Sequence, residues 1–465
     1  MRVNLASPLC SIDILAEALG AKILPVGTPC AKVGGIATHA QEVCRGDLFL
    51  AVRGKQTSGV RYIGEALSGG AAAVLSDTAM TPPAGSYWWL QVEDIDRALL
   101  SAAAYWRRRF GARVIAVAGS SGKTTVKELL AALLSEKYTV RYSEGNYNSS
   151  IGMPLALLSM ERADVAVLEL GINAVGEMEA MSRALAPNVA LLTNVGSAHV
   201  GQFSGFEELL AEKRSVTRGL VGDGLLLLPE SIPFLKGIAP YVWRVGVGGS
   251  AEVRAEDIRY GSFGTLATVS VEGRRALSLA WPVAGRLGLS CLLFAAAVGV
   301  LFGLDDAEII RGVARAAENT PRMRRILCGE RVLIDDTYNA SPEAMLLALE
   351  GLSYMAGGRP IAAVLGDMHE LGDKRQLYHE TVGMLAAGSN PSGLYLYGES
   401  ALDYARGAHR AGLAEERIHI FGRGEEAALA AHLASTLPPS VTVLFKASRR
   451  AALDRVVTML KEILQ

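Results

Sequence analysis

A glycine-rich string followed by a lysine and two threonines is the feature of this sequence with the clearest chemical meaning. Residues 114–137 read VIAVAGSSGKTTVKELLAALLSEK. The opening apolar letters predict a buried strand, and the apolar residues after Thr125 recur on one face of a helix. A glycine turn between strand and helix is the P-loop pattern, here in its short GxxGKT form, whose N–H groups bind phosphate. The string therefore predicts a site for a nucleoside triphosphate.

Each residue of this turn has a candidate role at the phosphates. Gly119 and Gly122 let the backbone approach phosphate oxygens, Lys123 supplies a positive charge, and the Thr124 hydroxyl is a ligand for Mg²⁺. A plain glycine turn with a surface lysine is the alternative, which the ordered succession of strand, turn, lysine, threonines and helix disfavours. The predicted nucleotide-binding residues of the turn are Gly119, Ser120, Ser121, Gly122, Lys123, Thr124 and Thr125.

Three polar residues stand at or just after the ends of later strands. Glu169 closes the string VAVLE, Asn194 follows VALLT, and His199 comes shortly afterwards. A carboxylate and an imidazole beside a triphosphate can hold Mg²⁺, which neutralises charge on a transferred phosphoryl group. Each residue alone is more simply a hydrogen-bonded or solvated side chain. Their shared position beside the phosphate loop predicts a metal site made by Glu169, His199 and Thr124.

The elements that carry these residues fall into three blocks, as expected for 465 residues at roughly 150 per domain. Residues 1–108 mix strands and helices, whereas 109–318 and 319–465 alternate apolar strings with helical patterns, which is typical of parallel sheets. We predict an α/β fold with three domains: a small first domain, a P-loop-type central domain with a mostly parallel sheet, and a doubly wound, Rossmann-like C-terminal domain.

Several individual elements are predicted within these blocks. In the last block, four strands end near Asp335, Gly366, Gly398 and Lys446, and ligands bind beyond such carboxyl ends. In the first block, the expected elements are helices near 12–19 and 62–67, a strand from residue 46 and a strand that ends at residue 75.

Composition excludes several functional classes. The chain has 46 Lys+Arg against 47 Asp+Glu, with no block of like charge, so neither nucleic acid nor a polybasic membrane patch is expected. The five cysteines contain no CxxC pair, so no disulfide framework or zinc site is signalled. The N-terminal stretch does not read as a secretory signal. These patterns predict a cytoplasmic protein. We also expect it to be a monomer.

One apolar run raises the question of a membrane. Residues 287–304, LGLSCLLFAAAVGVLFGL, contain no charge over 18 residues, the lower edge of a spanning length. The run holds three glycines and ends at Asp305 and Asp306, and no other run is comparable. We therefore predict a buried helix of the α/β core, apolar on all sides, and no membrane span.

Several strings resemble the Mur ligases, ATP-dependent amide-forming enzymes of peptidoglycan precursor synthesis. The central block carries AGSSGKTTVKE, GNYNSSIGMP, ELGINAVGEM and TNVGSAHVGQF, and the C-terminal block carries DDTYNASPEAM and VLGDMHELGD. GDLFLAVRGK and GAAAVL in the first block also fit, so the resemblance covers nearly the whole chain. It implies an enzyme that adds D-alanyl-D-alanine to UDP-N-acetylmuramoyl-tripeptide, with one domain each for the UDP substrate, ATP and the incoming dipeptide.

The resemblance also implies roles for single residues of the central block. Lys213 matches a family lysine that becomes carbamylated, which would turn a cation into a carboxylate-like metal ligand. Asn146, in the GNYN string, would lie at the reacting centre. The implied catalytic residues are Lys123, Asn146, His199 and Lys213, and the implied metal ligands are Thr124, Glu169, His199 and Lys213.

In the C-terminal block, the resemblance implies contacts with ATP. Asp336 would hold the ribose, and Arg324, or Arg322 in the other register, would reach the phosphates. The string FKASRR matches a family KGSR string through Lys446, Ser448 and Arg449. The implied mechanism has ATP phosphorylate the tripeptide carboxylate, after which the amine of the dipeptide attacks the acyl phosphate. Metal and Lys123 would stabilise the tetrahedral oxyanion, and closure of the last domain would exclude water.

The sequence departs from the family pattern at two places. Ala37, His39 and Gln41 stand in slots that usually hold Ser, Asp and Arg, so uridine recognition is expected to differ. Gly288 and Cys291 stand where the family has two asparagines near the adenine. Loss of amide donors weakens base selection and leaves phosphate binding intact. We therefore expect the base to be held less selectively, or by backbone groups.

Two other functions remain open at this point. The altered first domain is compatible with a related ligase that acts on a modified precursor. A non-catalytic nucleotide-binding paralogue is a second alternative, but it would have little reason to retain the charged centre. The retained residues are Lys123, Thr124, Glu169, His199 and Lys213.

Overall fold

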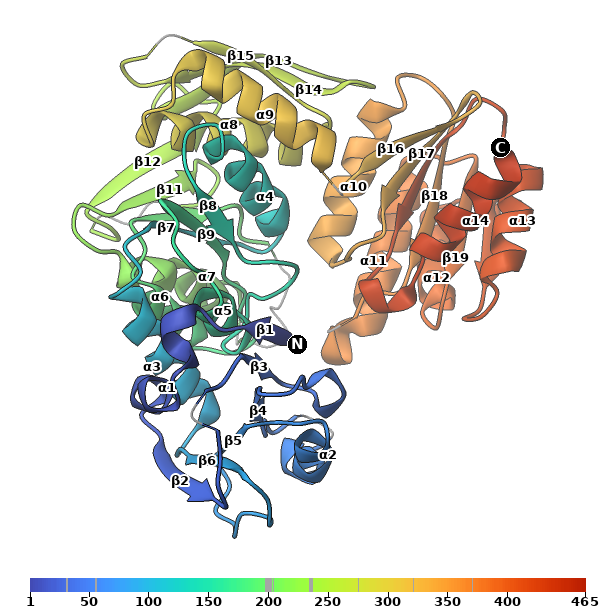
Figure 1. Cartoon of the computed structure of the whole chain (residues 1–465). Helices are drawn as coiled ribbons and strands as arrows, with labels where there is room; N and C mark the ends of the chain where they lie inside the picture. Colours follow the sequence, from blue (N-terminus) through green and yellow to red (C-terminus); the bar gives the residue numbers. More distant parts are fainter. Residues whose placement is uncertain are drawn as a thin grey trace.

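The computed structural model describes every residue except 31, 55–56, 197–202, 204, 234–236, 275, 321 and 370. Its strands form three sheets, each built from its own stretch of sequence: residues 2–91, 113–281 and 324–446. Figure 1 shows the blue N-terminal group of elements at the bottom, the central group above it, and the orange and red C-terminal group at the right. The predicted α/β fold with three domains is confirmed.

The first sheet has the strand order β1-β3-β4-β5-β6-β2. Strands β3 to β6 pair in parallel, whereas β1 and β2 close the two edges in antiparallel register. The elements are β1 (Arg2–Asn4), α1 (Ile12–Leu19), β2 (Lys22–Val26), β3 (Gly35–Ala37), β4 (Leu48–Leu50), α2 (Ile63–Ser68), β5 (Ala73–Ser76), β6 (Tyr87–Gln91) and α3 (Ile95–Arg107).

The second sheet has the order β15-β14-β13-β12-β11-β10-β7-β9-β8. Its strands β7 to β13 pair in parallel, and the hairpins β13–β14 and β14–β15 are antiparallel. The strands are β7 (Arg113–Ala118), β8 (Val140–Tyr142), β9 (Val165–Glu169), β10 (Val189–Leu192), β11 (Leu225–Pro229), β12 (Tyr241–Gly246), β13 (Val253–Gly261), β14 (Gly264–Val271) and β15 (Leu277–Trp281). The helices are α4 (Lys123–Leu134), α5 (Gly152–Leu158), α6 (Glu177–Leu185), α7 (Phe206–Arg214), α8 (Arg286–Leu301) and α9 (Asp306–Asn319).

The third sheet has the order β16-β17-β21-β18-β19-β20, in which only the hairpin β16–β17 is antiparallel. The last strand, β21, lies between β17 and β18, so the strand order reverses there. A reversal of this kind places a ligand site at the carboxyl ends of the flanking strands. The elements are β16 (Arg324–Cys328), β17 (Arg331–Asp336), α10 (Pro342–Met355), β18 (Ile361–Gly366), α11 (Arg375–Gly388), β19 (Gly393–Tyr397), α12 (Ala401–Arg410), β20 (Ile418–Phe421), α13 (Glu426–Thr436), β21 (Thr442–Lys446) and α14 (Asp454–Leu464).

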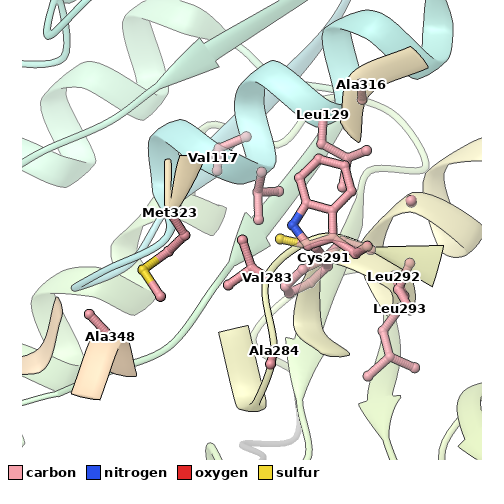
Figure 2. Packing of buried hydrophobic residues seen from close by; sticks show 14 of the residues in the cluster. Val117, Leu129, Val283, Ala284, Cys291, Leu292, Leu293, Ala316, Met323 and Ala348 are labelled. Atoms are coloured by element: carbon pink, nitrogen blue, oxygen red, sulfur yellow. The ribbon is translucent and has the colours of Figure 1, made fainter. Parts of the chain in front are cut away.

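The apolar run forms helix α8, as predicted. Its residues from Cys291 to Gly299 are buried, and the helix packs against α4, α9 and strands β13 to β15. Figure 2 shows Cys291 of α8, Leu129 of α4 and Val283 in this common core. In the part of the chain that the structure describes, no helix is long and apolar enough to cross a membrane.

The start of α8 leaves no room for a side chain at Gly288. A Cβ atom there would lie 1.9 Å from the carbonyl oxygen of Val283 and 2.4 Å from Thr265 Oγ1. These two groups are joined to each other, because the Thr265 hydroxyl donates to the Val283 carbonyl at 2.8 Å. The absence of an amide at position 288 is therefore tied to close packing of backbone against backbone.

This packing predicts that Gly288→Ala destabilises the protein. The added methyl group would have to displace a hydrogen-bonded carbonyl, and overpacking of this kind costs about 1–3 kcal/mol. Urea unfolding should show the loss as a lower midpoint, whereas Ser290→Ala on the same helix should change the free energy of unfolding by less than about 0.5 kcal/mol. An unchanged midpoint for Gly288→Ala would contradict this account of the helix start.

Candidate active site

A cavity of about 650 Å³ lies where the carboxyl ends of the second and third sheets face each other. The phosphate loop after β7 and Glu169 at the end of β9 form its central-domain side, and Asp336 of β17 and Lys446 of β21 form its C-terminal side. Met1, beside β1, also lines it. All three domains therefore contribute to one cavity. Of the four strand ends at which ligands were predicted, Lys446 lines the cavity, whereas Asp335, Gly366 and Gly398 are not among its lining residues.

The phosphate loop folds back tightly on the neighbouring strand. Gly119 has φ +146°, and a Cβ atom at this position would lie 2.0 Å from Thr193 Oγ1, so only glycine fits. Helix α4 then begins at Lys123, and no side chain in the described ranges caps its first turn. The first-turn N–H groups of an uncapped helix attract anions. The loop therefore has the geometry of a phosphate site.

Asn194 holds the loop in place. Its Oδ1 accepts hydrogen bonds from the backbone N–H groups of Ser120, at 3.1 Å, and Ser121, at 2.9 Å, and its Nδ2 donates to Ser121 Oγ at 2.7 Å. The two serines line the cavity as predicted, but their N–H groups are used within the protein. The sequence singled out Asn194 by its position after a strand, without indicating this role.

Two lysines meet at the carbonyl oxygen of Gly119. Lys123 Nζ and Lys213 Nζ each donate to it at 3.1 Å, although Lys213 comes from helix α7, far along the chain. Lys213 is 2% exposed. Burial, with the nearby charge of Lys123, lowers the pKa of the Lys213 amine to about 7. Burial also lowers the pKa of Lys123. Both amines lie beside the loop where negative charge is expected.

Glu169 is the buried carboxylate of the site. Its Oε2 accepts from the Thr124 hydroxyl at 2.9 Å and its Oε1 accepts from Asn148 Nδ2 at 2.7 Å. No described cationic side chain forms an ion pair with it, so its charge is open to a cation. Among the described residues no cluster of three His, Cys, Asp or Glu side chains could hold a metal. A hydroxyl, a carboxylate and substrate phosphates are nevertheless the oxygen donors that Mg²⁺ prefers.

The structure describes only one of two further predicted residues of the central domain, Asn146 and His199. Asn146 lines the cavity, on the same loop as Asn148. His199 falls outside the described residues, so its predicted metal and catalytic roles stay predictions. Asn148 itself was not predicted, although it stands in the same GNYN string that drew attention to Asn146.

On the C-terminal side, a buried ion pair joins the ends of two strands. Lys446 and Asp336 are register partners on β21 and β17, and their side chains form the pair. Lys446 Nζ also donates to the backbone carbonyl of Asn339 at 3.1 Å. Asp336 keeps a place at the cavity, where ribose binding was predicted, but its carboxylate is shared with Lys446. Asn339 carried no predicted role.

The two candidate arginines occupy different places. Arg322 lines the cavity, and its guanidinium lies 4.2 Å from the centre of the Tyr338 ring. Arg324 lies on β16, where it pairs with Asp335 at 3.0 Å, and it is not among the lining residues. Arg322 is therefore the arginine that the structure brings to the cavity, and a contact of either arginine with the phosphates stays a prediction. Arg324 lies elsewhere because it is paired with Asp335 across β16 and β17.

The fold and this cavity define a phosphate-loop enzyme that works between two α/β domains. The model of the Mur ligase middle domain matches residues 117–299, and that of the Mur ligase, glutamate ligase domain matches residues 321–449. These matches span more than half of the chain. The chain belongs to the Mur ligase family.

Curated relatives match over nearly their whole length. The UDP-N-acetylmuramoyl-tripeptide–D-alanyl-D-alanine ligase of Synechocystis is 34% identical, with 99% of this chain and 96% of the relative covered. The ligase of the same name from Bacillus subtilis is 29% identical over 92% of this chain and 93% of the relative.

Solved structures of MurF are similar along the whole chain. A MurF crystal structure from Acinetobacter baumannii has a TM-score of 0.83 and 26% identity, and the match covers 97% of this chain and 98% of that one. The MurF of Thermotoga maritima in complex with ADP has a TM-score of 0.75 and 27% identity, over 92% and 97% of the two chains. The likeness therefore extends through all three domains.

The geometry of the phosphate loop predicts the effect of Lys123→Ala. If Lys123 binds the phosphates, removal of its side chain should lower kcat by about 10²- to 10³-fold. The protein should stay folded, because the side chain donates only to the loop carbonyls of Gly119 and Ser120. Phosphate release and thermal unfolding would be measured together, with Lys22→Ala on the exposed edge strand β2 as a control. Near-wild-type turnover in the Lys123 variant would contradict the assignment of this loop as a phosphate site.

Proposed function

We propose that this protein is an ATP-dependent ligase that joins D-alanyl-D-alanine to UDP-N-acetylmuramoyl-tripeptide, with ADP and phosphate as the other products. The observation that carries the proposal is the cavity itself, in which a phosphate loop on one domain faces a second doubly wound domain. The full-length relatives named for this reaction support the choice of substrates. The setting is the cytoplasm, and the protein acts as a monomer.

The three domains divide the substrates among them. Residues 1–108 bind the UDP-linked tripeptide, residues 109–318 bind ATP, and residues 319–465 bind the dipeptide and close over ATP. This division is supported by the placement of Met1 at the cavity edge and of the phosphate loop opposite β17 and β21. Figure 1 shows the N-terminal strand β1 near the middle of the molecule, where the first domain meets the others.

ATP lies along the cavity with its phosphates at the loop. The first turn of α4 and Lys123 bind the phosphates, Arg322 reaches them from the C-terminal domain, and Asp336 holds the ribose. The base lies against apolar side chains that line the cavity beyond the loop. These are Val283, Leu287, Met323, Leu347 and Ala348. Figure 2 shows Val283 of the central domain together with Met323 and Ala348 of the C-terminal domain.

Thr124 and Glu169 fit a magnesium ion, since their oxygens are hard donors at the edge of the phosphate site. Such an ion neutralises phosphate charge during transfer. The remaining steps depend on residues of the protein itself. Lys123 stabilises charge on the transferred phosphoryl group as the tripeptide carboxylate attacks it and ADP leaves. Asn146 orients the acyl phosphate, and the C-terminal domain excludes water until the dipeptide amine displaces phosphate.

Lys213 is carbamylated in the active enzyme. Its ammonium and that of Lys123 share one carbonyl, so the two positive charges repel each other. A carbamate at Lys213 would convert this repulsion into attraction and would add a carboxylate-like oxygen pair beside Lys123. Burial supports the reaction chemically, because CO₂ adds only to the neutral amine and the pKa of Lys213 is lowered to about 7.

Phosphate release from ATP tests the overall function. We expect release when UDP-N-acetylmuramoyl-tripeptide and D-alanyl-D-alanine are both present, and little release when either is withheld. Mass spectrometry of the product would show the new amide bond. Turnover with another amine but not with this dipeptide would instead support the altered ligase. ATP binding without turnover with any amine would support the non-catalytic paralogue.

Carbon-13 NMR with labelled bicarbonate tests the carbamate. A carbamate signal should appear in the wild-type protein and be absent from Lys213→Met. The signal should grow as the pH rises through about 7, because the neutral fraction of the amine grows with it. A signal that persists in the variant, or a wild-type enzyme that is active without one, would contradict the assignment.

A further inference from the structure

Lys127 is a second, fully buried lysine on helix α4, one turn beyond Lys123. It is 0% exposed, and its Nζ donates to the backbone carbonyl of Ser143 at 2.6 Å. No carboxylate among the described residues forms an ion pair with it. Burial of an ammonium is costly unless it is paired. A neutral side chain could donate equally well to the one carbonyl. The hydrogen bond alone therefore does not explain why a lysine is buried at this position.

Ser143 connects Lys127 to the backbone of Glu169. The Ser143 N–H donates to the carbonyl of Val167 at 3.1 Å, and the Ser143 hydroxyl accepts from the N–H of Glu169 at 3.1 Å. Strand β8 ends just before Ser143 and is the last strand at its edge of the sheet. Lys127 therefore supplies a partner for the carbonyl of Ser143, a residue whose other polar groups are bonded to the end of β9.

The chain that follows Ser143 carries the amides of the site. Asn148 donates to the Glu169 carboxylate, and its backbone carbonyl accepts from the N–H of Gly171 at 2.7 Å. The same carboxylate accepts from Thr124, three residues before Lys127 on α4. Helix α4 thus holds Glu169 at two points: directly through the Thr124 hydroxyl and through Ser143 by way of Lys127.

We propose that Lys127 is a positioning residue that fixes the 143–148 loop and Glu169 in the arrangement that a divalent cation requires. The inference rests on the proposed function, because it supposes that Glu169 and Thr124 hold such a cation. The positive charge of Lys127 acts on the Glu169 carboxylate. Burial lowers the pKa of Lys127, and Glu169 is the group that most opposes this lowering. Lys127 touches neither substrate nor cation in this role.

The test compares Lys127→Met and Lys127→Arg with Lys137→Met. Lys137 is a suitable control because it also donates to a backbone carbonyl, that of Gly303, but is exposed. Mn²⁺ affinity would be measured by electron paramagnetic resonance with ADP present, together with hydrogen exchange of residues 143–149, kcat, KM for ATP and thermal unfolding. Loss of an outer partner of a metal ligand weakens metal binding about 10- to 100-fold.

We expect Lys127→Met to weaken Mn²⁺ binding and lower kcat by that factor, with faster exchange in 143–149 and a KM for ATP within about 3-fold of wild type. Lys127→Arg should recover part of each loss, and Lys137→Met should change none of them. If Lys127→Met does not fold, Lys127→Gln takes its place, and unchanged Mn²⁺ affinity and exchange in that folded variant overturn the proposal. Unchanged values in a folded methionine variant do the same. Failure of the proposed function would appear differently, as a wild-type protein that neither binds Mn²⁺ with ADP nor releases phosphate.

Discussion

The convergence of two ammonium groups on the carbonyl oxygen of Gly119 is the interaction on which the site depends. Lys123 comes from α4, the helix that directly follows the loop, and Lys213 comes from α7, which lies after β10 in the sequence. One neutral carbonyl cannot balance the charge of two ammonium groups. The loop therefore carries an excess of positive charge and requires a negatively charged group nearby. Phosphate bound at the loop, and the carbamate that we propose at Lys213, would supply it. On the C-terminal side of the cavity, Arg322 adds a further positive charge, whereas Lys446 is already paired with Asp336.

The parts of the fold that sequence patterns could predict are those set by local chemistry. The strand before the phosphate loop and helix α4 follow from an apolar run, a glycine turn and an amphipathic repeat, all adjacent in the chain. Helix α8 follows from an uncharged run that ends at two aspartates. The edge strands β1 and β2 were not predicted, because β2 contains Pro25 and is largely exposed, so it lacks the alternation that marks a strand.

The finer features of the site depend on residues brought together from distant elements, which patterns do not report. Asn194 could be singled out by its position, but its hold on Ser120 and Ser121 requires the pairing of β10 with β7. The presence of Arg322 at the cavity, and of Arg324 in an ion pair with Asp335, depends on where β16 begins and how it pairs with β17. The missing amide at Gly288 was first a departure from a family pattern, whereas the structure relates it to the close approach of Val283 and Thr265.

The contact between the central and C-terminal domains also determines how they can move. Residues of both domains belong to one apolar cluster, which passes through Met323 and Leu352. At its rim, Arg286 pairs with Glu350 at 2.7 Å and the rings of Tyr260 and Tyr354 lie 4.8 Å apart. A rotation that opened the cavity while keeping this cluster intact would have to pivot at the cluster, close to Met323 and Leu352. Strand β20, at the opposite edge of the third sheet from β16, would then be displaced more than the residues around Met323.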